Sequence, residues 1–357
     1  MAGTRPNFMK VSPIISELGR VGASAVLVHT GQHYDQSMSA AFFEDLALHP
    51  PHYQLEVGSG THALQTAKVM ERFEPVILAE RPRWVVVVGD VNSTLAAALV
   101  TAKLRDEVGS RLAHVEAGLR SNDWRMPEEI NRVLTDRVSD LLLTPSRDAR
   151  ANLIREGLEA DAIVFVGNVM IDSLFSHLDS ARQLCVAKSL GVDGPYAVTT
   201  LHRPSNVDNR DSLQTVLAGL SRIQETMPVI FPIHPRTRKN IEEFGLNSLV
   251  DCITLTEPLG YKAMLSLTDG ASIVLTDSGG LQEETSALRI PCVTLREQTE
   301  RPVTLAQGSN TLVPWPMSAL GILETFEKAL STKCDLPPIE GWDGHAARRI
   351  VEALLAR

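Results

Sequence analysis

The chain has 357 residues, which is enough for two domains of ordinary size, each with its own hydrophobic core. Hydrophobic residues make up 44% of the chain and charged residues 22%, which excludes a disordered or fibrous protein. The formal net charge of −9 argues against a nucleic-acid-binding protein, because neutralising phosphates requires a surplus of lysine and arginine.

Short β-branched runs alternate with helical patterns along the whole chain, as in crossover βαβ units with parallel sheets. The first series of predicted strands covers residues 25–30, 84–90, 112–118, 140–146 and 163–168. The second series covers residues 196–202, 229–234, 252–256, 272–280 and 291–296. Between strands, the helical pattern of 128–139 places four apolar residues on one face, namely Ile130, Val133, Leu134 and Val138.

The domain boundary is predicted where the strand signal is weakest, in the long helical pattern between residues 169 and 194. We expect an N-terminal domain over 1–168 and a C-terminal domain over 169–340, with a last helix in 341–357 that could pack on either. Both are predicted to be α/β domains, which bind ligands at the carboxyl ends of their strands. We therefore expect the two halves to face each other across a cleft.

The chain carries no signal of secretion, of a membrane span or of a metal site. No basic region followed by an apolar stretch opens the sequence, and no apolar run approaches the roughly 20 residues that cross a bilayer. The four cysteines lack a CxxC pair or zinc-ligand spacing. We expect a cytoplasmic protein without bound metal, whose cysteines are reduced and mostly buried.

Residues 276–284, TDSGGLQEE, follow an apolar strand and open a helix. In that position the amides of Ser278, Gly279 and Gly280 would point outward from a helix N-terminus, which is a binding site for anions. The glycines would let a phosphate approach the backbone closely. The alternative is a plain strand-to-helix turn with a capping side chain and two glutamates that favour the helix dipole.

Three carboxylates lie near strand ends or helix starts of the first half: Asp90, Glu116 and Glu128. Their placement predicts that they converge at the carboxyl edge of the sheet. An acid in an otherwise apolar strand costs several kcal/mol if it stays unpaired, so Glu116 must have a cationic partner or a function. For Glu116 the structural alternative is an ion pair with His114 or Arg120.

The other two carboxylates also have structural alternatives. Asp90 could cap the helix that starts near Asn92. Glu128 could be an exposed acid in the first turn of its helix, paired with Arg132 four residues later.

Two further strands of the second half end in histidine and arginine. His202 and Arg203 follow one strand, and His234 and Arg236 follow the next. A single histidine after a strand is more often a structural hydrogen-bonding group than a catalyst. Two such pairs, with further positive charge from Arg296 and Arg301, indicate a pocket for a diphosphate.

The sequence contains no complete cofactor-binding motif. Residues 58–63, GSGTHA, match the dinucleotide pattern GxGxxA, but the acid expected about twenty residues later is Glu80, which precedes the next strand rather than ending one. The phosphate-binding pattern of P-loop enzymes is absent from the sequence. We therefore expect no cofactor.

Nine short motifs, taken together, resemble the non-hydrolysing UDP-N-acetylglucosamine 2-epimerase family. In chain order they are GTRPNFMK, GQHYD, GDVNST, HVEAGLRS, MPEEINR, LHRPSNVD, HPRT, TDSGGLQEE and TERP. The resemblance covers essentially the whole chain. It implies a GT-B-like architecture of two Rossmann-like domains, usually a homodimer, that interconverts UDP-GlcNAc and UDP-ManNAc without metal or nicotinamide.

The resemblance also implies roles for individual residues, with UDP held by the C-terminal domain and the sugar met by the N-terminal one. It assigns Ser278, Gly279 and Gly280 to the diphosphate, Glu284 to the ribose, His234, Arg236 and Arg301 to ordering the nucleotide, Leu259 and Met264 to the uracil, and Arg5 and Lys10 to the sugar and diphosphate.

The implied reaction begins with departure of UDP, because the hydrogen at C2 of the sugar is not acidic until oxocarbenium character develops at C1. A carboxylate then removes the C2 proton and 2-acetamidoglucal forms. We expect Asp90, Glu116 and Glu128 to handle protons, with His202 assisting the diphosphate or a proton transfer. The alternatives are a hydrolysing 2-epimerase, a GT-B glycosyltransferase and a nucleotide-sugar-binding regulator.

The sequence departs from the family in two places. Some bacterial relatives carry arginine after the Gln-His of the QH loop and bind a second, activating UDP-GlcNAc there; this chain has Tyr34, so we expect simple hyperbolic kinetics. Family members usually have an apolar strand before the GTRP loop, whereas here only Met1 and Ala2 precede it. A missing central strand would leave its neighbours unpaired, and restoring about six apolar residues would raise stability and turnover.

Overall fold

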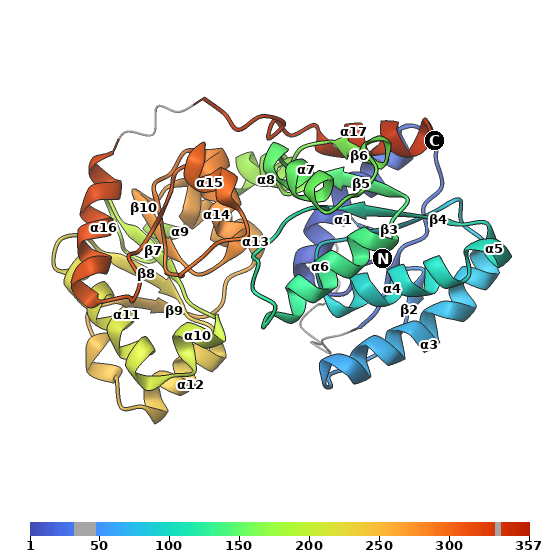
Figure 1. Ribbon diagram of the computed structural model, residues 1–357. Helices are drawn as coiled ribbons and strands as arrows, with labels where there is room; N and C mark the ends of the chain where they lie inside the picture. The colour runs from blue at the N-terminus through green and yellow to red at the C-terminus, as the bar shows by residue number, and fades with distance from the viewer. Residues whose placement is uncertain (32–47, 333–336) are drawn as a thin grey trace. The chain divides into compact units, whose positions relative to one another are not determined.

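The computed structural model describes residues 1–31, 48–332 and 337–357, apart from the side chain of Arg5. The chain forms two compact units. Unit 1 comprises Met1–Ser173 and Glu340–Arg357, and unit 2 comprises Leu174–Ile339. Both are built from parallel strands with helices packed around them; in Figure 1 unit 1 is coloured blue to green with its C-terminal segment in red, and the colour of unit 2 runs from green through yellow to red.

The sheet of unit 1 consists of parallel strands whose carboxyl ends share one edge. Four of them are paired in the order β3 (Trp84–Val88), β4 (Arg111–Val115), β5 (Leu141–Thr144) and β6 (Ile163–Phe165). A separate parallel pair consists of β1 (Val28–His29) and β2 (Tyr53–Gln54). The strands are rich in valine and leucine because a parallel sheet covered by helices is buried on both faces.

Helices connect these strands, since a parallel neighbour can only be reached by a crossover. The described helices that lie in or start from unit 1 are α1 (Arg5–Arg20), α3 (His62–Glu80), α4 (Asn92–Lys103), α5 (Arg105–Val108), α6 (Pro127–Val138), α7 (Arg147–Arg155), α8 (Val169–Arg182), α17 (Ala346–Leu355) and the 3-10 turn η1 (Ala160–Ala162).

The C-terminal helix α17 belongs to unit 1, where it packs against α1. The first two amides of α17, of Ala346 and Ala347, donate to the carboxylate of Asp172 at 3.1 and 2.7 Å. Asp172 thus satisfies helix-terminal donors from outside the helix.

Helix α6 is buried on a different face from the apolar one. Ile130 and Leu134 remain 38% and 44% exposed. The buried side chains are polar, among them Glu129, Arg132 and Asp136. Hydrophobic periodicity therefore points to the wrong side of this helix, because its inward face carries the ion pairs of the candidate site.

Unit 2 is a six-stranded parallel sheet. Its strands run in the order β12 (Asn310–Leu312), β11 (Cys292–Thr294), β10 (Ile273–Thr276), β7 (Ala197–Thr200), β8 (Val229–Pro232) and β9 (Thr254–Thr256). Within the described part of the unit, the remaining elements are α9 (Val186–Ser189), α10 (Pro204–Val207), α11 (Arg210–Gln224), α12 (Pro235–Glu243), α13 (Tyr261–Asp269), α14 (Gly279–Leu288), α15 (Pro302–Ala306), α16 (Ala319–Ser331) and η2 (Asn247–Leu249).

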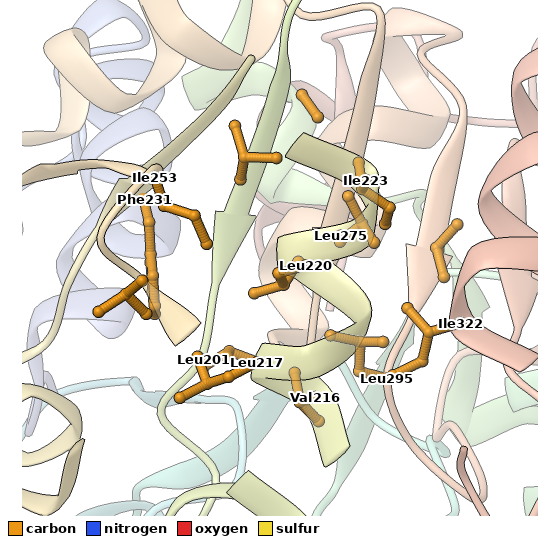
Figure 2. Close-up of a cluster of buried hydrophobic side chains, with 14 of the residues drawn as sticks. Leu201, Val216, Leu217, Leu220, Ile223, Phe231, Ile253, Leu275, Leu295 and Ile322 are labelled. Atoms are coloured by element: carbon orange, nitrogen blue, oxygen red, sulfur yellow. The ribbon is translucent and has the colours of Figure 1, made fainter. Parts of the chain in front are cut away.

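The core of unit 2 lies between this sheet and helices α11 and α16. Leu217 and Leu220 of α11, Leu275 of β10 and Ile322 of α16 belong to one buried hydrophobic cluster (Figure 2). Each of these side chains is fully buried, which stabilises the unit by about 1.5–3 kcal/mol per side chain relative to exposure.

The predicted α/β class with two Rossmann-like units is confirmed, and all ten predicted strands are present, most of them shorter than predicted. The structure adds β2 and β12, which have two and three residues and too little pattern to be recognised. The expectation that the cysteines are mostly buried is wrong, since Cys185 and Cys252 are exposed and only Cys292 of the three described is buried. Among the described residues no helix has the length and apolar character to cross a membrane.

The first two residues lie between the facing edges of β1 and β3. Ala2 forms an isolated parallel β-bridge with His29, and the Ala2 amide donates to the Val28 carbonyl at 2.9 Å. The Met1 amine donates to the Val86 carbonyl at 3.1 Å. The neighbouring strands are thus bridged at residues 1 and 2, which corrects the expectation that they are wholly unpaired.

Beside Met1 lies a groove of about 370 Å³ with largely apolar walls. Its lining includes Ile14 and Leu18 of α1, Phe73 of α3, Val85 of β3 and Leu355 of α17. The lining also includes Leu27 and Trp84, so the groove lies beside the starts of β1 and β3, the two strands that residues 1 and 2 bridge.

We expect that adding six apolar, β-branched residues before Met1 raises the midpoint of thermal unfolding by several degrees. The added strand would bury apolar area in the groove and pair with the edges of β1 and β3. The matched control is a six-residue glycine-serine extension, measured in the same thermal melt. Equal midpoints for the two extensions would contradict the prediction.

Candidate functional site

Glu116 and Lys10 form a buried ion pair at the carboxyl edge of the sheet in unit 1. The Lys10 ammonium, from α1, contacts the Glu116 carboxylate directly after β4, and their side chains are only 10% and 5% exposed. Glu116 also has φ of 75°, a left-handed conformation that a non-glycine residue holds only when its surroundings enforce it. Both alternatives for Glu116 are wrong, because its partner is Lys10 rather than His114 or Arg120.

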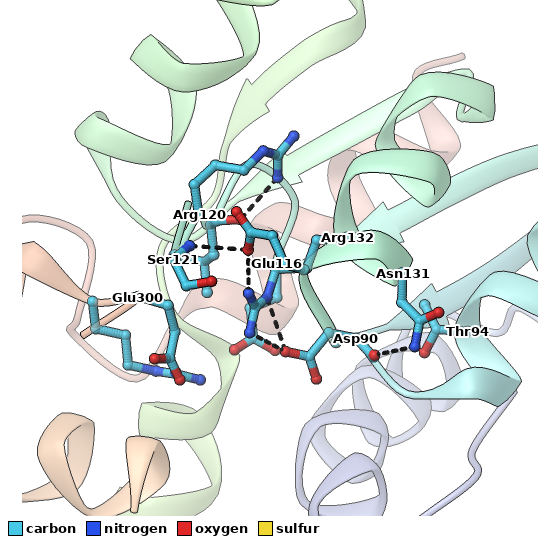
Figure 3. A network of polar contacts seen from close by, with 12 residues as sticks. Asp90, Thr94, Glu116, Arg120, Ser121, Asn131, Arg132 and Glu300 are labelled. Carbon is cyan, nitrogen blue, oxygen red and sulfur yellow. Dashed lines mark hydrogen bonds and ion pairs between the residues drawn. The ribbon is translucent and has the colours of Figure 1, made fainter. Parts of the chain in front are cut away.

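Asp90, which follows β3, is held by Arg132 of α6. The Arg132 Nη2 and Nε atoms lie 2.7 and 2.9 Å from Asp90 Oδ2 (Figure 3). The Asp90 side chain remains 29% exposed, so it is accessible from outside. Asp90 does not cap α4, whose N-cap residue is Val91 without a side-chain cap.

The two adjacent glutamates of α6 have different roles. Glu129 is buried and accepts hydrogen bonds from the Ser121 and Asn122 amides at 2.9 and 2.8 Å, and from Arg132 at 2.5 Å. Glu128 is half-buried, in the first turn of α6. The alternative that pairs Glu128 with Arg132 is wrong, because Arg132 binds Asp90 and Glu129 instead.

In unit 2 the turn between β10 and α14 has the geometry of an anion site. Ser278 is the N-cap of α14, and its side chain accepts from the Leu281 amide at 3.5 Å. A Cβ on Gly279 would lie 2.5 Å from Arg301 Nη1, so only glycine leaves room for this guanidinium. Gly280 is open, because a Cβ there would meet only Ser278 Oγ at 3.9 Å.

Asp277 orders the turn that carries His202 and Arg203. Its buried carboxylate accepts from the His202 amide at 3.1 Å, the Arg203 amide at 2.9 Å and Asn206 Nδ2 at 3.1 Å. His202 Nδ1 lies 3.0 Å from Asp277 Oδ1 while its side chain is 46% exposed. These interactions hold the Asp277 pKa below its ordinary value despite burial.

Three arginines gather around one buried glutamate beside this turn. Arg203, Arg296 and Arg301 place guanidinium nitrogens 3.5, 2.8 and 2.5 Å from Glu300 carboxylate oxygens. Arg301 Nε also lies 2.6 Å from Glu283. With three cations and two carboxylates the cluster keeps a surplus positive charge at the N-terminus of α14, which favours an anion.

His234 and Arg236 lie at the start of α12 and are exposed. His234 is the N-cap, and its Nδ1 accepts from the Arg236 amide at 3.2 Å. Arg236 forms an ion pair with Asp208. Partial loss of solvation, together with the neighbouring His202 and Arg236, lowers the His234 pKa.

The remaining sequence-predicted residues of unit 2 line a less polar region. Leu259 and Met264 are half-buried and pack against the same apolar cluster. Glu284 is buried, and this burial raises its pKa to about 7 against the opposing effect of the Tyr261 hydroxyl. Glu284 is therefore partly protonated near neutral pH rather than a first-turn anion that favours the helix dipole.

Sequence reasoning missed several of these residues. Arg132, Glu129, Asp277 and Glu300 lie in the quoted motifs but were not assigned to the site, since only the folded positions show what they bind. Tyr34 and the side chain of Arg5 fall outside the described residues. Among the described residues no group of three or more His, Cys, Asp or Glu side chains could hold a metal ion.

The chain matches a family model described as UDP-N-acetylglucosamine 2-epimerase over residues 17–355. It is 46% identical over 320 residues to the UDP-N-acetylglucosamine 2-epimerase of Methanocaldococcus jannaschii, covering 87% of this chain and 86% of that one. It is 44% identical over 315 residues to the UDP-2,3-diacetamido-2,3-dideoxy-D-glucuronate 2-epimerase of Pseudomonas aeruginosa, covering 87% and 86%.

Solved structures give the same result. The crystal structure of the M. jannaschii UDP-GlcNAc 2-epimerase in complex with UDP-GlcNAc and UDP matches with a TM-score of 0.91 and 43% identity, covering 100% of this chain and 98% of that one. The Neisseria meningitidis UDP-GlcNAc 2-epimerase bound to UDP-GlcNAc matches with a TM-score of 0.86 and 28% identity, covering 100% and 98%. These matches confirm the family that the nine motifs indicate.

We expect Gly279→Ala to lower the free energy of unfolding by about 1–3 kcal/mol, because the added methyl group displaces Arg301 from its ion pairs. Gly280→Ala is the matched control, since the space around it is open. Urea denaturation of the full chain measures both. The same loss in both variants would show that Arg301 is not the cause.

We expect the stability of Glu284→Gln, relative to the parent chain, to rise between pH 4.5 and 7. In this window the unfolded chain has lost the Glu284 proton and the folded chain retains it, so parental stability falls as pH rises. The glutamine variant lacks this loss, which is on the order of 3 kcal/mol.

Urea denaturation at pH 5 and pH 8 tests this prediction, with the exposed Glu242→Gln as control. A difference between Glu284→Gln and the parent that stays constant with pH would contradict it.

Proposed function

Because the chain belongs to the UDP-N-acetylglucosamine 2-epimerase family, we propose that it epimerises UDP-GlcNAc at C2 to UDP-ManNAc by eliminating UDP and adding it back. The observation that carries this proposal is the pair of carboxylates at the ends of adjacent strands β3 and β4. Each is held by its own cation, Asp90 by Arg132 and Glu116 by Lys10.

Paired carboxylates suit a reaction that needs two proton-handling positions. Inverting C2 requires a proton to leave one face and another to arrive on the opposite face. A cation beside each carboxylate holds it in one orientation, so that it can meet the C2 hydrogen on a defined face. We assign the two positions among Asp90, Glu116 and Glu128, the last of which is half-buried on the neighbouring helix.

The proposed reaction has two stages, elimination of UDP and its return to C1. The bond between C1 and the diphosphate oxygen breaks, and its electron pair leaves with UDP. A carboxylate takes the C2 proton, and the electrons of that C–H bond form the C1=C2 double bond of 2-acetamidoglucal. In the return direction a proton is delivered to the other face of C2, and the UDP oxygen adds to C1.

Unit 2 supplies the groups that stabilise the leaving diphosphate. Arg203, Arg296 and Arg301 hold surplus positive charge beside the N-terminus of α14, where negative charge grows as UDP departs. We assign the diphosphate to these arginines and to the turn at Ser278–Gly280. His202, ordered by Asp277, assists the diphosphate or a proton transfer.

A relative named for a different UDP-sugar gives a second candidate substrate. The P. aeruginosa relative named for UDP-2,3-diacetamido-2,3-dideoxy-D-glucuronate is 44% identical, close to the 46% of the M. jannaschii relative. Elimination and return of UDP is chemically the same for both sugars. Only the groups at C3 and C6 of the sugar differ.

Proton NMR of UDP-GlcNAc with the protein in deuterated water tests the function. We expect deuterium at C2 and the appearance of UDP-ManNAc. Free ManNAc and UDP would instead support a hydrolysing epimerase. No reaction with UDP-GlcNAc, but C2 exchange with the diacetamido uronate, would move the proposal to that substrate, and no exchange with either would refute epimerisation.

The amide variants Asp90→Asn, Glu116→Gln and Glu128→Gln test the assignment of the carboxylates. We expect loss of the C2 base to lower the rate of solvent deuterium exchange by at least about 100-fold. The exposed Asp106→Asn is the matched control. The assignment is wrong if all three variants retain near-normal exchange.

A further inference from the structure

His114 is a fully buried histidine of β4 whose two ring nitrogens both face hydrogen-bond acceptors. Its Nε2 lies 2.9 Å from the Gly89 carbonyl oxygen, and its Nδ1 lies 2.6 Å from Asp136 Oδ1. A carbonyl oxygen can only accept, so Nε2 must carry a hydrogen. Nδ1 thus faces Asp136.

Asp136 of α6 has partners on both of its carboxylate oxygens. Its Oδ2 accepts from the Gly118 amide at 3.0 Å and lies 2.8 Å from Arg120 Nη1. Arg120 is shared with Glu156, whose carboxylate lies 2.7 Å away. Asp136 therefore connects His114 to the Gly118 amide through its two carboxylate oxygens.

The two partners of His114 belong to the turns that carry the candidate catalytic carboxylates. Gly89 precedes Asp90, and its φ is +67°. A Cβ on Gly89 would lie 3.2 Å from Lys10 Nζ and 3.5 Å from Glu116 Oε2, so this turn lies directly against the Lys10–Glu116 pair. Asp136 in turn holds the Gly118 amide in the turn after Glu116.

We propose that His114 acts as a positioning residue, joining through Asp136 and the Gly89 carbonyl the two turns that present Asp90 and Glu116. Its role in activity rests on the proposed function of these carboxylates. Its two ring nitrogens bond in two directions, one to the residue before Asp90 and the other to the carboxylate that holds the turn after Glu116. It thereby fixes the spacing of the two carboxylates without touching substrate.

The positioning role is tested by kinetics. We expect His114→Gln to lower kcat by about 100-fold, because a misplacement of roughly 1 Å at catalytic groups costs about that much. KM and the Kd of UDP should stay within about twofold, since the nucleotide is assigned to unit 2. The exposed His49→Gln is the matched control and should retain parental kcat.

A kcat of His114→Gln within about twofold of the parent would overturn the positioning role, as would equal losses in UDP binding and kcat. The double variant with Asp136→Asn should be no worse than either single variant, since both remove one linkage. Failure of the proposed function is distinguishable: absence of both C2 deuterium exchange and UDP-ManNAc with the parent protein would refute it, whereas a parental kcat in His114→Gln would refute only the positioning role.

Discussion

The buried Asp136 carboxylate, compensated by the groups that bind it, is the interaction on which the rest of unit 1 depends. It binds His114 of β4, Arg120 and the Gly118 amide, all inside the unit. Losing one partner of such a cluster typically costs 3–5 kcal/mol, because the remaining charge stays buried and uncompensated. The cluster thus ties stability to the geometry of the turns that carry the carboxylates.

Unit 2 also pairs buried charges, and the residue at the centre of its charged cluster is Glu300. Glu300 gathers three arginines that would otherwise repel one another, and Glu283 holds Arg301 from a second side. The guanidinium groups are therefore fixed before any anion arrives. Fixed donors stabilise developing charge without the cost of reorganisation, which is the form of electrostatic catalysis that a departing diphosphate needs.

The sequence was sufficient to predict the sheets and the edges where the site lies, because strand patterns and the residues that follow them are local properties. It could not say which acid binds which base. Glu128 and Glu129 are adjacent and chemically alike, yet only the turn of α6 decides that Glu129 is buried against Ser121. The inward face of α6 was misjudged for the same reason, since ion pairs rather than apolar residues cover it.

The C-terminal helix α17 lies in unit 1, so the chain leaves that unit after Ser173 and returns to it at Glu340. Unit 2 is therefore inserted into unit 1, and two covalent crossings join them. Cutting the backbone at one crossing would leave unit 2 attached through the other. The donors of α17 bind Asp172, which directly precedes Ser173, so the returning segment is fastened beside the point where the chain first leaves unit 1.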